Sequence, residues 1–295
     1  MIKLAIVGYG NLGKSLERQI LANKRKYELV GIFSRRRVES PFGTKVYAIQ
    51  TIEDFIEQID TLLLCGGSEK DLLTHTPELS KYFSVIDCFD THTKIRPQRT
   101  LVNGICKESH HHALISCGWD PGLFSLVRVI ANALKIPYTT EWGKGVSMGH
   151  SQAIRTISGV QSAISYTYPP ARRGGLHRRE LFVVAPSGEH TRIEREIRAK
   201  KDYFEGDNVK IHFISQAEFD RDHQTLMHQG RVYAHSKEME LEFKVKMDSN
   251  PDFTGRIVLA YVNALEMAKK YLPYGAYTVL DLPIGWLCDK SEYLI

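Results

Sequence analysis

The sequence contains no apolar stretch long enough to span a membrane, and no signal peptide precedes its first apolar strand. It also has no low-complexity tract. Its five cysteines are odd in number and lack the spacing of a metal site. Cys65, Cys88 and Cys117 lie in or beside apolar runs, where a free thiol behaves as a small hydrophobic group. These absences argue against a membrane protein and favour a reducing cytoplasm as the compartment.

The chain is weakly basic, with 39 Lys and Arg against 34 Asp and Glu and a formal net charge of +5. Basic residues concentrate at 35–37 and 172–179, but both clusters are short and neither alternates with aromatic residues, as a nucleic-acid surface would. We therefore expect a small-molecule partner and no nucleic acid. At 295 residues, 43% of them hydrophobic, the chain is long enough for two domains with separate cores.

Three consecutive histidines, 110–112, raise the question of a metal site. Neighbouring side chains in a chain point in different directions, which does not suit a common metal ion. We interpret these histidines as a helix end and expect no metal.

A glycine-rich motif follows the apolar run 4–7. The sequence there reads Gly-Tyr-Gly-Asn-Leu-Gly, and helical spacing of apolar residues begins at once. Such glycines permit a tight turn and close approach of the backbone to a pyrophosphate, which binds at the positive end of the following helix. The motif therefore predicts a dinucleotide site. Its predicted cofactor-binding residues are Gly8, Tyr9, Gly10, Asn11, Leu12 and Gly13.

The end of the next apolar run, 29–33, indicates which dinucleotide binds. An NAD site usually carries Asp or Glu about twenty residues after the motif to hold the ribose 2′-hydroxyl, whereas an NADP site has Arg. Here a serine and arginines replace the carboxylate, and we interpret the last of them, Arg37, as a solvated turn charge. We therefore predict NADP as the cofactor. The further predicted cofactor-binding residues are Ser34, Arg35, Arg36, Cys65 and Gly66.

Through residue 118, short apolar runs alternate with helix-like segments. Predicted strands cover 4–7, 29–33, 45–49, 61–66, 84–90 and 113–117, and predicted helices lie near 12–20, 52–58, 69–82 and 98–110. Continuous apolar runs separated by helices indicate a parallel sheet covered on both faces, the doubly wound Rossmann-type α/β arrangement. We assign residues 1–118 to a dinucleotide-binding domain.

The pattern changes after residue 118. A helix is predicted near 124–135, followed by strands that alternate apolar and charged residues, most clearly 239–247, which is typical of an antiparallel strand with one buried face. Shorter candidate strands are 165–168, 180–185, 210–214 and 231–234. We predict an α+β substrate-binding domain with a mostly antiparallel sheet over 119–251. The tail 252–295, with a predicted helix at 253–272 and a strand at 275–280, is expected to pack back on the first domain.

Two acids follow strands of the first domain, at the edge where open parallel sheets bind their ligands. Asp90 follows the run 84–89, and Asp120 follows the run 113–117. An enzyme that oxidises an amine needs a carboxylate near the ammonium group, to attract it and to accept its proton before hydride leaves the carbon. Both acids are candidate catalytic residues. The alternative is helix N-capping, which suits Asp120 in front of Pro121.

The segment 143–151 is rich in glycine, which suits either a loop that closes over a substrate or an ordinary connection between domains. The second domain also carries arginines, among them Arg178 and Arg179, that can pair with a carboxylate in bidentate fashion. Most arginines are simply solvated, so residue type alone does not choose among them.

A set of longer motifs resembles the meso-diaminopimelate dehydrogenase family. The motifs are GYGNLG (8–13), FSRR (33–36), CFD (88–90), SCGWDPG (116–122), SMGHS (147–151), SNPDFT (249–254) and GAYTVLDLP (275–283). The resemblance implies NADP-dependent, reversible oxidative deamination at the D-centre of meso-2,6-diaminopimelate. The implied products are ammonia and L-2-amino-6-oxopimelate, which cyclises to tetrahydrodipicolinate. It also implies a cytoplasmic homodimer, formed through the second domain, that serves lysine biosynthesis.

The same resemblance implies roles for individual residues. Asp90 and Asp120 would hold the D-centre amine, and Met148, Gly149 and His150 would form a covering loop near the reacting carbon. The remaining implied substrate-binding residues are Trp119 beside the two acids, Trp142 as an aromatic residue that lines the site, and Thr167, Arg179, His228 and Asn250 around the distal L-centre and its carboxylate. Two of these positions have neighbouring alternatives, Arg178 for Arg179 and His223 for His228.

Other functions stay open at this point. One is an NADP-linked dehydrogenase of broader D-amino-acid scope on the same scaffold, because a few pocket residues decide scope. Another is a non-enzymatic protein that senses NADP, and a nucleic-acid-binding role is a distant third. Activity with meso-diaminopimelate compared with simple D-amino acids distinguishes the first. Tight binding of NADPH without any absorbance change from substrate and NADP would favour the second.

Overall fold

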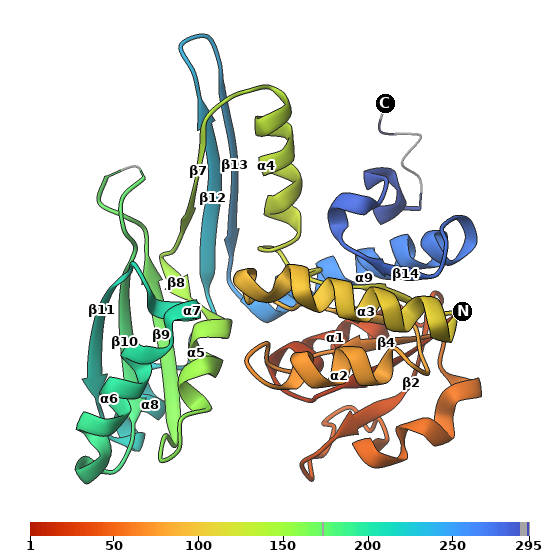
Figure 1. Cartoon of the computed structure of the whole chain (residues 1–295). Helices are drawn as coiled ribbons and strands as arrows, with labels where there is room; N and C mark the ends of the chain where they lie inside the picture. The colour runs from red at the N-terminus through yellow and green to blue at the C-terminus, as the bar shows by residue number, and fades with distance from the viewer. Residues whose placement is uncertain (173, 290–293, 295) are drawn as a thin grey trace. The chain divides into compact units, whose positions relative to one another are not determined.

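The computed structural model describes residues 1–172, 174–289 and 294. It divides into two compact units, Met1–Ser125 with Pro251–Ile295, and Leu126–Asn250 (Figure 1). The first unit thus includes 119–125, which the sequence analysis places in the second domain. No helix in the described part of the chain is long and apolar enough to cross a membrane.

The first unit is built on a seven-stranded sheet with the order β14-β6-β5-β4-β1-β2-β3, and every pair in it is parallel. The strands are β1 (Ile2–Val7), β2 (Tyr27–Ser34), β3 (Val46–Ala48), β4 (Thr61–Leu64), β5 (Val85–Asp87), β6 (His112–Leu114) and β14 (Gly275–Tyr277). The helices are α1 (Asn11–Ala22), η1 (Ile49–Gln58), α2 (Asp71–Leu79), η2 (His92–Lys94), α3 (Ile95–Ser109), α9 (Asn250–Tyr271), η4 (Val279–Asp281) and η5 (Ile284–Leu287), of which the η helices are 3₁₀. The predicted Rossmann-type sheet is confirmed, and β14 from the C-terminal tail extends it beside β6.

The strands are continuous apolar runs because helices cover both faces of the sheet. Leu4–Val7 and Leu62–Leu64 are at most 2% exposed. The helices α1, α2 and α3 lie around this sheet in Figure 1, and the core extends from it to Phe83, Phe89 and Val102.

Three strands end earlier than their apolar runs predict. β4, β5 and β6 stop at Leu64, Asp87 and Leu114, whereas the predicted strands continue to 66, 90 and 117. For β5 and β6 the reason lies at Asp87, whose side chain accepts hydrogen bonds from the backbone N–H groups of Phe89 and Ser116. Side-chain bonds replace the sheet ladder there, and the chain turns into loops at the carboxyl edge.

The second unit contains two sheets, where the sequence predicts one mostly antiparallel sheet. The strands are β7 (Tyr138–Trp142), β8 (Gly145–Val146), β9 (Ser162–Tyr168), β10 (Arg178–Val184), β11 (Asn208–Phe213), β12 (His228–His235) and β13 (Glu240–Met247). The helices are α4 (Leu123–Ala133), α5 (Met148–Arg155), η3 (Ser187–Glu189), α6 (His190–Ala199), α7 (Lys201–Phe204) and α8 (Gln216–Asp222). The sheet β13-β12-β7 is antiparallel, and the sheet β11-β10-β9-β8 is mixed because β10 and β11 run parallel.

The parallel pair follows from the chain between its strands. Parallel strands need a crossover of a dozen or more residues, and η3, α6 and α7 supply it between β10 and β11. Ile193 and Ile197 of α6 are fully buried with Leu181 and Val183 of β10. The antiparallel sheet instead packs on α4, through a small cluster of Ala131, Ile136, Ala234 and Leu241.

Candidate active site

The glycine-rich motif lies at the topological switch point of the first sheet. β1 has β2 on one side and β4 on the other, so the connections of the two halves leave in opposite directions from this place. Ligands of open α/β sheets bind beyond the carboxyl ends of strands at such a point. Gly8, Tyr9 and Gly10 follow β1, while Cys65 and Gly66 follow β4. The backbone N–H of Cys65 donates to the carbonyl of Val7 at 2.8 Å, which brings both loops together.

Two glycines of the motif serve different purposes. A Cβ on Gly13 would lie 2.3 Å from the carbonyl oxygen of Gly8, so the packing of α1 against the loop requires glycine there. A Cβ on Gly10 would meet no atom of the described chain within 4 Å. The chain itself leaves this space open, as close approach of a pyrophosphate requires.

The helix α1 begins beside that open space. Its first turn contains Asn11, Leu12 and Gly13 and carries no acidic residue, so no side chain neutralises the positive end of the helix. Leu12 is buried in the packing of the unit, whereas Asn11 is exposed. The motif therefore offers an anion the backbone N–H groups and the dipole of α1.

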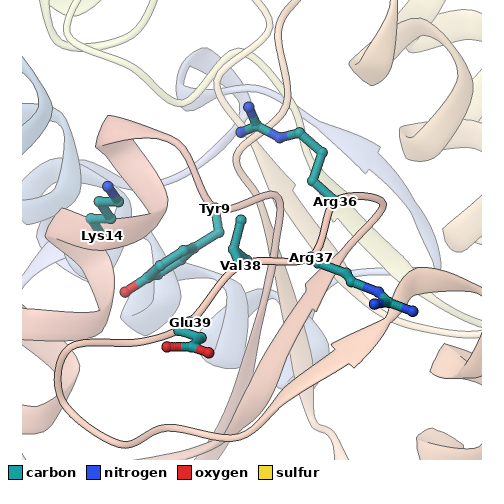
Figure 2. A pocket seen from close by; sticks show the side chains of 6 residues that line it. All are labelled: Tyr9, Lys14, Arg36, Arg37, Val38 and Glu39. Atoms are coloured by element: carbon teal, nitrogen blue, oxygen red, sulfur yellow. The ribbon is translucent and has the colours of Figure 1, made fainter.

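A pocket of about 390 Å³ adjoins the motif, between α1 and the segment after β2. Its lining is formed by Tyr9, Lys14, Arg36, Arg37, Val38 and Glu39. Figure 2 shows the guanidinium groups of Arg36 and Arg37 pointing away from each other on the same segment. Three cations beside a dinucleotide motif suit a phosphate. Arg37 is exposed, in keeping with a solvated turn charge, and it is also one of the residues that line this pocket.

Arg35 is placed differently from its two neighbours. Its guanidinium forms an ion pair of 2.5 Å with Asp71, the first residue of α2, and its side chain is 60% exposed. The other oxygen of Asp71 accepts the N–H of Gly67 at 3.1 Å, next to Gly66. Arg35 thus connects the end of β2 to the loop after β4, two places where the sequence predicts cofactor-binding residues.

Ser34 ends β2 and fixes the start of the basic segment. Its hydroxyl accepts the backbone N–H of Arg36 at 3.1 Å, and the residue is buried. This short-range bond determines how the chain leaves the sheet.

Asp90 lies beyond the carboxyl end of β5. Its backbone N–H donates to the hydroxyl of buried Ser68 at 3.0 Å. Its Oδ1 is buried and receives no hydrogen bond from any residue that the structure describes. A buried polar atom without a partner is costly and marks a place where a ligand can supply one. Burial raises the pKa of Asp90, and the negative charge of Asp120 raises it further.

Asp120 is held near Asp90 by a tight turn of residues 118–122. The N–H of Gly118 donates to the carbonyl of Pro121 at 3.0 Å, and the N–H of Leu123 donates back to the carbonyl of Gly118. Trp119 is buried, with its ring edge-on to Phe124 at a centroid distance of 5.1 Å. The charge of Asp120 contributes to the raised pKa of Asp90, so the two predicted acids lie within electrostatic range of each other.

In the second unit, the residues predicted around the distal centre gather at the short strand β8. Gly145 pairs with Thr167 of β9, and a Cβ on Gly145 would lie 2.6 Å from Nδ1 of His228. The side-chain amide of Asn250 donates to the carbonyl of Val146 at 3.4 Å. All three of these polar residues are buried.

Arg179 joins this group through Thr167. Its Nη1 donates to the Thr167 hydroxyl at 2.6 Å, while its Nε pairs with the carboxylate of Asp207. The side chain of Arg179 is only 8% exposed, so the pair is largely desolvated. Burial and the positive charge of Arg179 lower the pKa of His228 to about 4, which keeps this imidazole neutral near pH 7.

The two neighbouring alternatives lie elsewhere. Successive residues of a strand point to opposite faces, so Arg178 leaves the face of Arg179 and instead stacks over the ring of Tyr168. His223 bonds to the hydroxyl of Tyr166, whose side chain points away from the face of Thr167. Neither residue lies with the group around β8.

The predicted covering loop is wrong as a description of the backbone. Met148, Gly149 and His150 form the first turn of the helix α5. Nδ1 of His150 bonds to the Ser147 hydroxyl and Nε2 to the Tyr203 carbonyl, both at 2.7 Å. A carbonyl only accepts, so Nε2 carries the proton and Nδ1 accepts from Ser147. These two bonds hold the start of α5 in place.

Trp142 ends β7. Its backbone N–H donates to Nε2 of buried His177 at 3.0 Å, and the two rings lie 5.0 Å apart. Burial lowers the pKa of His177, in keeping with a neutral imidazole that accepts this bond.

Sequence reasoning missed the residues that support the predicted ones. Ser68, Asp71 and Asp207 carry no motif of their own, and each acts on a residue distant in the sequence, Asp90, Arg35 and Arg179 respectively. The described residues contain no group of three or more His, Cys, Asp or Glu side chains suited to a metal ion.

Comparison with known proteins gives a consistent result. The family of the diaminopimelic acid dehydrogenase C-terminal domain matches residues 118–249. The meso-diaminopimelate D-dehydrogenase of Acetivibrio thermocellus is 42% identical, over 98% of this chain and 95% of that protein. The Corynebacterium glutamicum enzyme of the same name is 38% identical, over 95% of this chain and 93% of that protein.

Two solved structures are also similar. An engineered D-amino acid dehydrogenase bound to NADP⁺ has a TM-score of 0.92 at 36% identity, covering 98% of this chain and 96% of that one. The C. glutamicum DAP dehydrogenase in complex with DAP has a TM-score of 0.88 at 37% identity, with the same coverage. The chain therefore belongs to the meso-diaminopimelate D-dehydrogenase family.

Proposed function

We propose that the protein catalyses the NADP-dependent, reversible oxidative deamination of the D-centre of meso-2,6-diaminopimelate, in lysine biosynthesis. The products are ammonia and L-2-amino-6-oxopimelate, which cyclises to tetrahydrodipicolinate. The observation that carries the proposal is the Asp90 carboxylate, which has an unpartnered buried oxygen beside Asp120 at the carboxyl edge of the sheet. Membership of the meso-diaminopimelate D-dehydrogenase family indicates the substrate on which this acid acts.

The residues around the switch point fit NADP. The open space at Gly10 and the start of α1 suit the pyrophosphate, and Lys14, Arg36 and Arg37 suit the 2′-phosphate. When bound, NADP⁺ supplies the acceptor for the hydride that leaves the D-carbon. The solved relative named as bound to NADP⁺ supports this choice.

Asp90 and Asp120 act on the substrate nitrogen. Two carboxylates attract the ammonium group. Because its pKa is raised, Asp90 is a stronger base than an ordinary carboxylate. Removal of a proton leaves a neutral amine, from which hydride can depart. The imine that forms is then attacked by water and releases ammonia.

The buried group around β8 binds the other end of the substrate. Arg179 and Thr167 offer donors to the distal carboxylate, and neutral His228 and Asn250 add hydrogen-bonding groups. If these contacts fix the L-centre, only the D-centre presents its hydrogen to the nicotinamide, and stereoselectivity follows from position.

The test is formation of NADPH from NADP⁺ with the meso-, L,L- and D,D-isomers of diaminopimelate and with simple D-amino acids. We expect meso-diaminopimelate to be the best substrate, the D,D-isomer to be weak and the L,L-isomer to be inert. Equal rates with simple D-amino acids would favour the broader dehydrogenase. Tight NADPH binding with no turnover of any substrate would favour the NADP-sensing protein.

We further propose that the protein is a cytoplasmic homodimer. All five cysteines are free thiols, which suits a reducing compartment. Val129, Ile130 and Leu134, in and just after α4, are about half exposed, an apolar surface that a second copy can cover. Light scattering on the purified protein tests the dimer, and a monomer at micromolar concentration contradicts it.

A further inference from the structure

A fully buried glutamate lies beside the proposed 2′-phosphate pocket. Glu17 is on α1 and is 0% exposed. Its two carboxylate oxygens accept hydrogen bonds from the hydroxyl groups of Tyr9 and Ser40. Burying a carboxylate is costly unless its oxygens are hydrogen-bonded, so both bonds matter for the fold. Both bonds go to Tyr9 and Ser40, neither of which is a proposed substrate-binding residue.

The two hydroxyl groups belong to two separate segments that both contribute residues to the pocket. Tyr9 is part of the glycine-rich motif, and its side chain lines the pocket in Figure 2. Ser40 lies at the end of the segment 34–40, which carries the pocket arginines and Glu39. One carboxylate therefore connects the motif to the arginine-bearing segment.

Ser40 also organises the turn that follows. Its oxygen accepts the backbone N–H groups of Phe42 at 3.0 Å and Thr44 at 3.3 Å. At the other end, the hydroxyl of Ser34 holds the N–H of Arg36. The basic segment is thus fixed at both ends, and Glu17 holds the end that is farther from β2.

We propose that Glu17 is a positioning residue that sets the preference for NADP over NAD by holding the arginine-bearing segment against Tyr9. The inference rests on the proposed function, because it concerns the same cofactor site. Arg36 and Arg37 recognise a phosphate only if their backbone is held at the correct distance from the ribose. NAD has no 2′-phosphate, so its binding depends far less on this segment.

The test is binding of cofactor fragments to Glu17→Gln, Tyr9→Phe and Ser40→Ala, measured by calorimetry. Adenosine 2′,5′-bisphosphate probes the pocket, and adenosine 5′-monophosphate probes the rest of the adenosine site. We expect each variant to weaken bisphosphate binding, by about tenfold for Glu17→Gln, equivalent to about 1.4 kcal/mol. Binding of the monophosphate should change less than twofold. The KM for NADP should rise with the KM for NAD unchanged.

A control is Glu28→Gln, which removes the same charge from an exposed position on β2. It should leave the affinity for both fragments unchanged. Tyr9→Phe removes only the printed bond to Glu17, so it keeps the question answerable if Glu17→Gln fails to fold. Ser40→Ala also removes the bonds to the N–H groups of Phe42 and Thr44, so it tests the whole anchor at this end of the segment. Their double variant should lose less than the sum of the single losses, because both act through one carboxylate.

Two results overturn the proposal. If folded Tyr9→Phe and Ser40→Ala bind the bisphosphate as the wild type does, Glu17 has a structural role only. If all variants lose both fragments equally, the effect is general and not specific to the phosphate. A wild-type protein that does not prefer the bisphosphate contradicts the proposed cofactor itself, which is a different outcome from either of these.

Discussion

Asp90 shows how one residue can combine a structural cost with a chemical use. Its buried oxygen lacks a donor and its pKa is raised, both of which disfavour the charged form in the folded protein. A group that accepts a proton from the substrate ammonium needs both properties, because a carboxylate with a raised pKa binds a proton more strongly. The sequence identified Asp90 from its position after a strand. It did not identify Ser68, which holds the backbone of Asp90 from a different loop.

The first prediction concerns the pH dependence of Asp90. Below its raised pKa the carboxyl is protonated and cannot accept a proton, so kcat/KM for diaminopimelate should fall as the pH falls, with a midpoint above 3.8. Asp90→Asn should lower kcat by about 10²-fold or more and leave the affinity for NADPH unchanged. A pH–rate profile of both proteins checks this. Nearly normal turnover by the variant would return Asp90 to a structural role.

The same group predicts a trend in stability. The pKa of Asp90 is higher in the folded than in the unfolded chain, so the ionised group disfavours folding once the pH exceeds the unfolded value. Asp90→Asn stays neutral, and its melting temperature relative to wild type should therefore be higher at pH 8 than at pH 4. Calorimetry at both pH values measures this, and a difference of the opposite sign contradicts it.

A further prediction concerns Asp207, the partner of Arg179. Removing one member of a buried ion pair leaves an uncompensated charge, which costs about 3–5 kcal/mol. Because Asp207 is 14% exposed, we expect Asp207→Asn to destabilise the protein by about 2–4 kcal/mol and to raise the KM for diaminopimelate. Asp222→Asn, which breaks an exposed pair with Arg221, is the control and should alter neither. An unchanged KM in Asp207→Asn would separate Arg179 from the substrate.

At the scale of elements, the turn 118–122 determines where Asp120 lies. Gly122 has φ +132°, and a Cβ there would lie 1.9 Å from the carbonyl oxygen of Gly118. We therefore predict that Gly122→Ala lowers the free energy of unfolding by at least about 2 kcal/mol and reduces turnover with it. Gly104→Ala is the control, because a Cβ on this helical glycine meets nothing within 4 Å. It should stabilise by about 0.5–1 kcal/mol. Urea unfolding of both variants measures these changes, and equal stabilities would contradict the role of the turn.

The predictability of elements depended on their periodicity. Strand β13 was predicted almost to its ends, because apolar and charged residues alternate strictly along it. Helix α5 was missed, because Gly149 and the preceding glycines resemble a loop. What makes it a helix is tertiary, namely the bonds of His150 to Ser147 and to the carbonyl of Tyr203.

At the scale of the whole chain, the Rossmann-type sheet was predictable and the second unit was predictable only in class. Buried parallel strands such as β1 and β4 contain continuous apolar runs, Leu4–Val7 and Leu62–Leu64, that stand out in a sequence. The division of the second unit into two sheets was not predictable. The parallel β10–β11 pair forms across a helical crossover, which the local alternation of apolar and polar residues does not reveal. The distal group was likewise assigned by resemblance, since its members come together only through β8.

The central claim is that this chain removes hydride from the D-centre of meso-diaminopimelate. The most direct test uses two substrates, one with deuterium at the D-centre and one with deuterium at the L-centre, followed by mass spectrometry of the NADPH formed. We predict one deuterium atom in NADPH from the first substrate and none from the second. Unlabelled NADPH from the first substrate, or label transferred from the L-centre, would contradict the claim.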